Sequence, residues 1–169
     1  MKKDNWIMIV FVLTFILSFL FSTISNLLSN INIIVMLIIL LLTISIGILF
    51  DMIGVAVLSC EEATFHAKAA SKIAGAKECI ALIKNSNKTS SVCCDVIGDI
   101  CGIISGTLAA GLIIMIKDEL ILDILVTATV SSITVGSKAI GKKIAIKKCD
   151  NIIFTVGKII NKLKIKKKH

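Results

Sequence analysis

Long apolar runs separated by short polar links dominate the pattern along this chain. Four such runs extend over about residues 6–28, 31–59, 93–116 and 120–136. About 20 apolar residues span the hydrocarbon core of a bilayer, so each run has close to the length of a membrane-crossing helix. The second run is longer than one crossing needs, so part of it must tilt, bend or follow the surface. The pattern therefore predicts an all-α integral membrane protein with four transmembrane helices.

The polar intervals divide the chain into three parts. Residues 1–30 are predicted to form an extra N-terminal transmembrane helix, and residues 31–141 a domain of three transmembrane helices. Within that domain, the alanine-rich interval 61–91 has a helical pattern and is predicted to be a cytosolic juxtamembrane loop helix. It should end in a turn over 85–91, where Asn, Ser and Thr cluster. The remaining residues, 142–169, form a basic tail.

The tail has the pattern of an amphipathic helix. Apolar side chains recur at i, i+1, i+4, i+7, i+8 and i+11, at Ile152, Ile153, Val156, Ile159, Ile160 and Leu163. Basic side chains at Lys158, Lys162, Lys164 and Lys166 accompany them. We expect this C-terminal helix to lie flat on the membrane, with its isoleucine face toward lipid and its lysines on anionic head groups. Binding to another protein or to a specific lipid head group is the alternative.

Lysine placement predicts the topology. Net charge is +8 and all 19 positive residues are lysine, since arginine is absent. Five lysines lie in the interval 61–91 and eleven follow Gly136, whereas the short links near Asn30 and at 117–119 share one. The positive-inside rule then predicts a multi-pass cell-membrane protein with both termini and the loop in the cytoplasm. Without the bidentate forks of arginine, nucleic-acid binding is not expected.

Two carboxylates stand out within the third apolar run. Asp95 and Asp99 lie one helical turn apart and, at 100° per residue, share a face with Gly98, Gly102 and Gly106. A carboxylate inside the bilayer costs about 2.5 kcal/mol or more, so it usually serves an ion path, a proton relay or a buried partner. Glycines let a neighbouring helix approach closely, so these three are expected to pack against one.

The fourth run adds a polar stripe on one predicted helix face, made of Asp123, Thr127, Ser131, Thr134 and Lys138. Hydroxyl and carboxylate oxygens are hard ligands, suited to magnesium or calcium. Facing each other, the two stripes could line a cation route. The alternative is that they join helices, with Asp99 paired to Lys138 or to a backbone group.

The six cysteines form no CxxC motif. In a reducing compartment they are expected to be free thiols that pack as small apolar residues. A soft-metal site or redox sensor built from Cys60, His66, Cys79, Cys93 or Cys94 is the alternative. Walker, HExxH, GxSxG and Rossmann glycine motifs are all missing, so we do not expect an enzyme.

The stretch from Asp51 to about Ile160 resembles the transmembrane domain of the CNNM/CorB/CorC magnesium transporter family. Three segments carry the resemblance. They are Ser59-Cys60-Glu61-Glu62-Ala63-Thr64-Phe65 at the end of the second run, Ile97-Gly98-Asp99 in the third, and Val135-Gly136-Ser137-Lys138-Ala139-Ile140-Gly141-Lys142 after the fourth. The family's corresponding segments are of the Ser-Gly-Ser-Glu-Thr-Ala, Ile-Gly-Asn and Phe-Gly-Glu-Ile-Ile-Pro-Lys type.

The resemblance implies a homodimer that binds or transports a divalent cation of the magnesium or cobalt type. Mg²⁺ would be held by Asp99, helped by Glu61, Ser59 and Ser137, with Asp95 nearby. Three departures oppose transport: Ser137 replaces the family's glutamate, Cys60 replaces a ligating serine and Gly141 replaces a proline. This would be a reduced form of the family, without CBS domains. A non-transporting scaffold or regulatory protein that keeps the fold but has lost the ion site is the second hypothesis.

Overall fold

The computed structural model describes residues 2–27, 32–116 and 120–166, which contain helices and no strand. The helices are α1 (Lys2–Leu27), α2 (Ile33–Ser59), α3 (Glu62–Ala70), α4 (Ala76–Lys84), α5 (Ser86–Ser90), the π-helix η2 (Ser91–Gly98), α6 (Asp99–Ile116), α7 (Leu120–Lys147) and α8 (Cys149–Lys166). The predicted all-helical class is confirmed.

Three helical stretches are long and apolar enough to cross a membrane: Ile33–Ser59, Ser86–Ile113 and Ile124–Lys147. They correspond to the second, third and fourth apolar runs, and α7 continues well past the predicted end at residue 136. In α1 the apolar stretch of the described residues, Met8–Leu20, is shorter than a full crossing. Three helices therefore have the length and composition of membrane spans, as expected for a membrane protein, and the fourth span stays a prediction.

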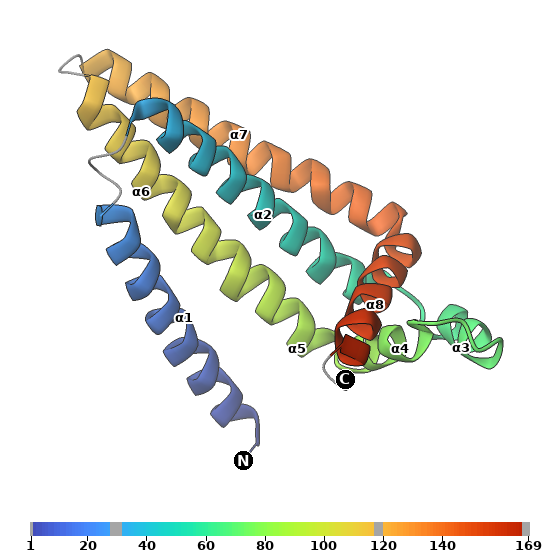
Figure 1. Ribbon diagram of the computed structural model, residues 1–169. Coiled ribbons are helices and arrows are strands. Elements are labelled where there is room, and N and C mark those ends of the chain that lie inside the picture. The colour runs from blue at the N-terminus through green and yellow to red at the C-terminus, as the bar shows by residue number, and fades with distance from the viewer. Residues whose placement is uncertain (1, 28–31, 117–119, 167–169) are drawn as a thin grey trace.

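Helix α2 lies between α6 and α7 and packs against both, while α1 runs beside α6 (Figure 1). The short helices α3 and α4 gather with α8 at one end of the long helices, on the side where the chain also begins (Figure 1). Large apolar side chains along α1 and the outer faces of α2 and α7 are exposed, as expected for helices that meet lipid.

Two apolar clusters hold the fold together. One joins α2 to α6 through Met36, Leu40, Ile44, Leu108 and Leu112. The other, which we call the end cluster, joins the end of α2 to the short helices, α7 and α8, and its members are Ala56, Val57, Cys60, Phe65, Cys79, Ala145 and Ile153. Burying one large side chain such as Phe65 or Ile153 away from water contributes about 1.5–3 kcal/mol.

The prediction of a single loop helix over 61–91 is wrong, because α3 and α4 are separate helices. Lys72 has φ 54° and Gly75 has φ 91°, so the backbone turns in the left-handed region between them. Gly75 also meets α8 closely, since a Cβ there would lie 2.8 Å from the backbone nitrogen of Lys158. The turn expected over 85–91 is wrong as well, because the chain there is helical in α5 and continues into η2.

The tail forms the predicted helix, α8, but its isoleucines do not share one environment. Ile153 is fully buried in the end cluster, so the prediction that it faces lipid is wrong for this side chain. Ile159 and Leu163 are exposed. The physical reason is that α4 and the end of α2 offer apolar surface to the same face of α8 that the pattern assigned to lipid.

Candidate functional site

An ion pair is buried where three candidate spans meet. Lys138 Nζ of α7 lies 3.4 Å from Asp51 Oδ2 of α2, and the two side chains are 20% and 4% exposed. The same ammonium donates a hydrogen bond to the carbonyl oxygen of Gly98, at 3.0 Å, where η2 ends. One cation of the chain is thus held by a carboxylate oxygen and a backbone oxygen from two other helices.

Local sequence explains how these groups come so close. Gly98 has no side chain, and a Cβ at that position would collide with the Asp51 carboxylate. Gly54 likewise makes room for Cys94, whose thiol donates to the backbone oxygen of Asp51 at 3.7 Å. The π-helix η2 lies at this contact, and π-helical turns are rare elements that frequently mark functional sites.

Charge balance sets the energetics of the pair. Burying two charges is costly, and their attraction offsets the cost only when the geometry is good. Removing one partner of such a pair typically costs about 3–5 kcal/mol, because the other charge stays buried without compensation. Asp51 and Lys138 therefore depend on each other, and any change that separates them must supply another counter-charge.

The carboxylates expected to hold the metal lie elsewhere. Asp99 is the first residue of α6 and is exposed, and Asp95 is exposed in η2, where it accepts a hydrogen bond from Ser91 Oγ at 2.6 Å. The pairing of Asp99 with Lys138, the alternative drawn from the sequence, is wrong, because Lys138 pairs with Asp51. The buried carboxylate is that of Asp51, which was not among the expected ligands.

The other expected ligands are dispersed as well. Ser59 is exposed at the end of α2, where its hydroxyl donates to the backbone oxygen of Val55 at 2.9 Å. Glu61 is exposed ahead of α3, and Ser137 is half-buried in α7. Of the polar stripe on α7, Thr127 and Ser131 are exposed, and the side chain of Asp123 lies outside the described part of the chain.

The three predicted packing glycines differ. Gly98 is buried against Asp51, but a Cβ on Gly102 or Gly106 would meet no atom within 4 Å. Within this chain, the packing prediction is therefore wrong for Gly102 and Gly106. The close contacts of α2 come instead from its own small residues, since a Cβ on Gly47 would lie 3.0 Å from the Cβ of Cys101.

Two of the four tail lysines expected at the membrane surface have contacts inside the protein. Lys158 Nζ lies 4.3 Å from the centre of the Phe154 ring, and Lys164 Nζ lies 3.5 Å from Glu78 Oε1 of α4. Lys162 and Lys166 are exposed. All four remain available to water on one side, so lipid contact and these internal contacts are compatible.

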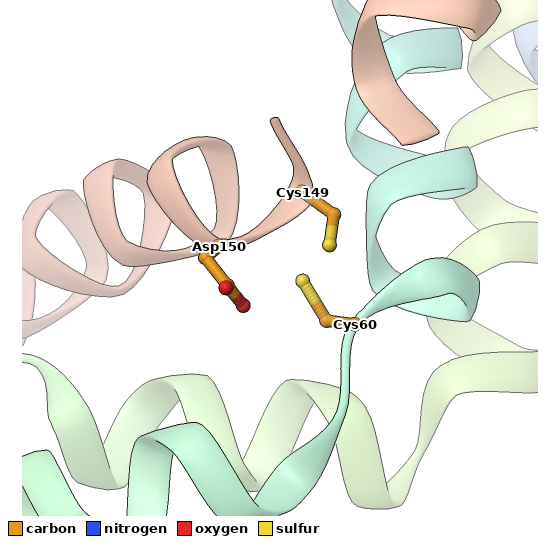
Figure 2. Close-up of side chains that lie close together, drawn as sticks. All are labelled: Cys60, Cys149 and Asp150. Atoms are coloured by element: carbon orange, nitrogen blue, oxygen red, sulfur yellow. The ribbon is translucent and has the colours of Figure 1, made fainter. Parts of the chain in front are cut away.

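A second group of acidic side chains lies where α2 ends and α8 begins. The thiols of Cys60 and Cys149 and a carboxylate oxygen of Asp150 lie within 4.8 Å of one another and point toward a common space (Figure 2). Among the described residues, it is the one group in which three or more His, Cys, Asp or Glu side chains lie close enough together to hold a single metal ion. The sequence offered Cys60 as a candidate but gave no signal for its two partners.

No family model, curated protein or solved structure matches the chain, so the geometry above carries the functional argument.

Proposed function

We propose that this protein binds or moves a divalent cation of the magnesium or cobalt type within the membrane, with Asp51 at the centre of the site. The observation that carries the proposal is the held ammonium of Lys138, which a carboxylate oxygen and a backbone oxygen contact from two neighbouring helices. Such oxygens are the ligands that Mg²⁺ prefers. The resemblance to the CNNM/CorC-type transmembrane domain supports the same class of ion.

In this proposal Lys138 acts as a tethered competitor of the ion. A divalent cation that approaches Asp51 must displace the ammonium, and the returning ammonium then favours release of the ion. Movement across a membrane needs binding that is favourable enough to enter and weak enough to leave, which competition provides. Displacement also shifts α7 relative to α2 and η2, because Lys138 connects them. Ion binding is therefore coupled to helix rearrangement.

The proposal includes Asp99 and Asp95 as secondary carboxylates. They are exposed on the outer side of η2 and α6, next in the chain to Gly98 and one turn before it. A homodimer would cover that side and bring a second set of carboxylates near the ion path. Ser59, Glu61 and Ser137, which the resemblance marks, would then contribute only after rearrangement.

For the topology we propose four crossings of the cell membrane with both termini cytoplasmic. The lysine distribution supports this orientation, as does the arrangement of α3, α4 and α8 at the end where the chain begins (Figure 1). The exposed lysines of α8 would then face anionic lipid on the cytoplasmic side.

Thermal unfolding of the purified protein in detergent, with Mg²⁺, Mn²⁺, Co²⁺ or Zn²⁺, tests the ion site. We expect Mg²⁺ to stabilise the wild type, Asp51→Asn to remove the shift, and Asp99→Asn to reduce it. Glu62→Gln, which removes a carboxylate outside the spans, is the matched control and should keep the full shift. A wild type without any Mg²⁺ shift, or an unchanged shift in Asp51→Asn, overturns the proposal.

The second candidate is a non-transporting membrane scaffold, and one observation favours it: Lys138 already neutralises Asp51 without any ion. The variant Lys138→Met distinguishes the ion-binding function from the scaffold function. A site for an ion predicts that this variant gains affinity for Mg²⁺, because Asp51 loses its competitor. A scaffold predicts that the variant is only destabilised, and that no ion restores it.

A further inference from the structure

The junction between α2 and α8 brings three acidic groups together. Cys60 Sγ, Cys149 Sγ and an Asp150 carboxylate oxygen all lie within 4.8 Å of one another (Figure 2). None of the ion pairs among the described side chains involves Asp150. The group therefore differs from the Asp51 pair, in which a lysine balances the acid.

The fold fixes the position of each member. Cys60 follows the last turn of α2 in an extended conformation, with φ −81° and ψ 144°, and is itself buried in the end cluster. Cys149 and Asp150 open α8, directly after the bend at Lys148 that separates it from α7. Ile153, one turn further along α8, is fully buried in the same cluster. This packing keeps the start of α8 next to Cys60.

Burial and the neighbouring acids disfavour the ionised form of the Cys60 thiol. Burial raises the pKa of the Cys60 thiol above its ordinary value of 9.0, and the neighbouring Cys149 and Asp150 raise this pKa further. A bound divalent cation would reverse this preference, because metal ligation deprotonates thiols and the ion's charge offsets theirs.

We propose that Cys60, Cys149 and Asp150 bind one zinc ion, with water as the fourth ligand. Two thiolates and a carboxylate are a donor set that zinc accepts and magnesium does not. With Zn–S bonds of about 2.3 Å, a tetrahedral site places the two sulfurs about 3.8 Å apart. The observed separation is at most 4.8 Å, so small side-chain rotations complete the site. The ion would fasten the start of α8 to the end of α2.

Zinc titration of the full-length protein in detergent, with all thiols reduced, tests this proposal. We expect one zinc per chain in competition with a chromophoric chelator, and thiolate-to-metal charge-transfer absorption when Co²⁺ is used as the probe. Cys149→Ser and Cys60→Ser should each abolish both signals. Asp150→Asn should weaken zinc binding about 10-fold or more while keeping the absorption, since both sulfurs remain.

Cys79→Ser is the matched control, because Cys79 is buried in the same cluster but donates its thiol to the backbone oxygen of Ile153 at 3.3 Å. It should bind zinc like the wild type. Cys149 is only half-buried, so Cys149→Ser keeps the test valid if Cys60→Ser does not fold. The proposal is overturned if the wild type binds no zinc, if Co²⁺ gives no charge-transfer band, or if Cys149→Ser binds zinc as tightly as the wild type.

The zinc site does not rest on the proposed ion site at Asp51. Asp51→Asn should leave zinc binding at the cysteines unchanged, and Cys149→Ser should leave the Mg²⁺ shift unchanged. Loss of both signals in one of these variants would show a general folding defect, and the two proposals therefore fail separately.

Discussion

Two acidic groups of this protein differ in how their charge is balanced. One is Asp51 within the candidate spans, and the other is the group of Cys60, Cys149 and Asp150 at the end of α2. Asp51 has an internal cation, Lys138, held at 3.4 Å. No ion pair among the described side chains involves the cysteine group, and burial together with the neighbouring acids raises the pKa of the Cys60 thiol. In the proposals above, the internal cation at Asp51 would compete with an external ion, which suits reversible binding, whereas the cysteine group would suit a retained ion. Hard oxygens in the first and soft sulfurs in the second would also favour different metals.

The largest expected effect comes from Lys138→Met, which leaves Asp51 buried without its partner. We expect a loss of about 3–5 kcal/mol in the free energy of unfolding, measured by denaturant titration in detergent. Lys142→Met, an exposed lysine one turn further along α7, is the control and should change little. Replacing both partners, in Asp51→Leu with Lys138→Leu, should recover most of the loss. Equal stability of Lys138→Met and the control would show that the pair is unimportant.

Ile153→Asp should have the next largest effect, because it places a charge in the fully buried part of the end cluster. We expect a loss of about 2–4 kcal/mol and release of α8 to protease in liposomes. Ile159→Asp is matched, since Ile159 is 54% exposed on the same helix. If lipid contact alone holds the tail, both variants should release it equally. Protection of the tail in Ile159→Asp would assign the docking to the protein core.

Gly98→Ala adds a single methyl group beside Asp51 and so tests the geometry of the Asp51–Lys138 pair. Its Cβ would collide with the Asp51 carboxylate, so we expect a loss of about 1–3 kcal/mol. Gly102→Ala has open space around its Cβ and should be neutral, or stabilise by up to about 1 kcal/mol through helix propensity. Denaturant titration of both variants gives the difference. A larger loss in Gly102→Ala would place the tight helix contact on the other face.

The smallest expected effect is the pH dependence of stability that the Cys60 thiol contributes. The folded-state pKa of Cys60 lies above its ordinary value of 9.0, so its contribution to stability is complete below pH 9.0 and declines above it. The decline is at most about 1.4 kcal/mol per pH unit. Melting temperatures of wild type and Cys60→Ser, compared from neutral to alkaline pH, should converge as pH rises. With zinc bound, the wild-type curve should lose this decline.

The sequence predicts the helices well but not their partners. Run length is a local property, and it located the C-terminal ends of α2 and α6, although α7 continues past its predicted end. The pairing of Asp51 with Lys138 depends on how α2 and α7 pack, which no local pattern encodes. Asp99 looked stronger because it shares a predicted face with glycines, yet a Cβ on two of those glycines would meet no atom within 4 Å. The carboxylate that packs closely against a glycine is that of Asp51, which lies against Gly98.

The same limit explains the cysteine group. Cys149 and Asp150 lie in a basic stretch, far along the chain from Cys60, and no CxxC spacing connects them. Only the bend at Lys148, which turns α8 back across the end of α2, brings them together. The break between α3 and α4 was missed for a similar reason, because Gly75 is needed where α8 crosses its backbone.

The position of Ile153 in the end cluster also has a consequence for biosynthesis. Phe65, Cys79 and Val57 come from earlier segments, whereas Ile153, which closes their cluster, comes from α8 and is translated after the three candidate spans. Domains and their parts emerge from the ribosome in N- to C-terminal order. The cluster therefore stays open, with apolar side chains exposed beside the membrane, until α8 is synthesised. Chains arrested before this point would present that open surface to chaperones and membrane proteases.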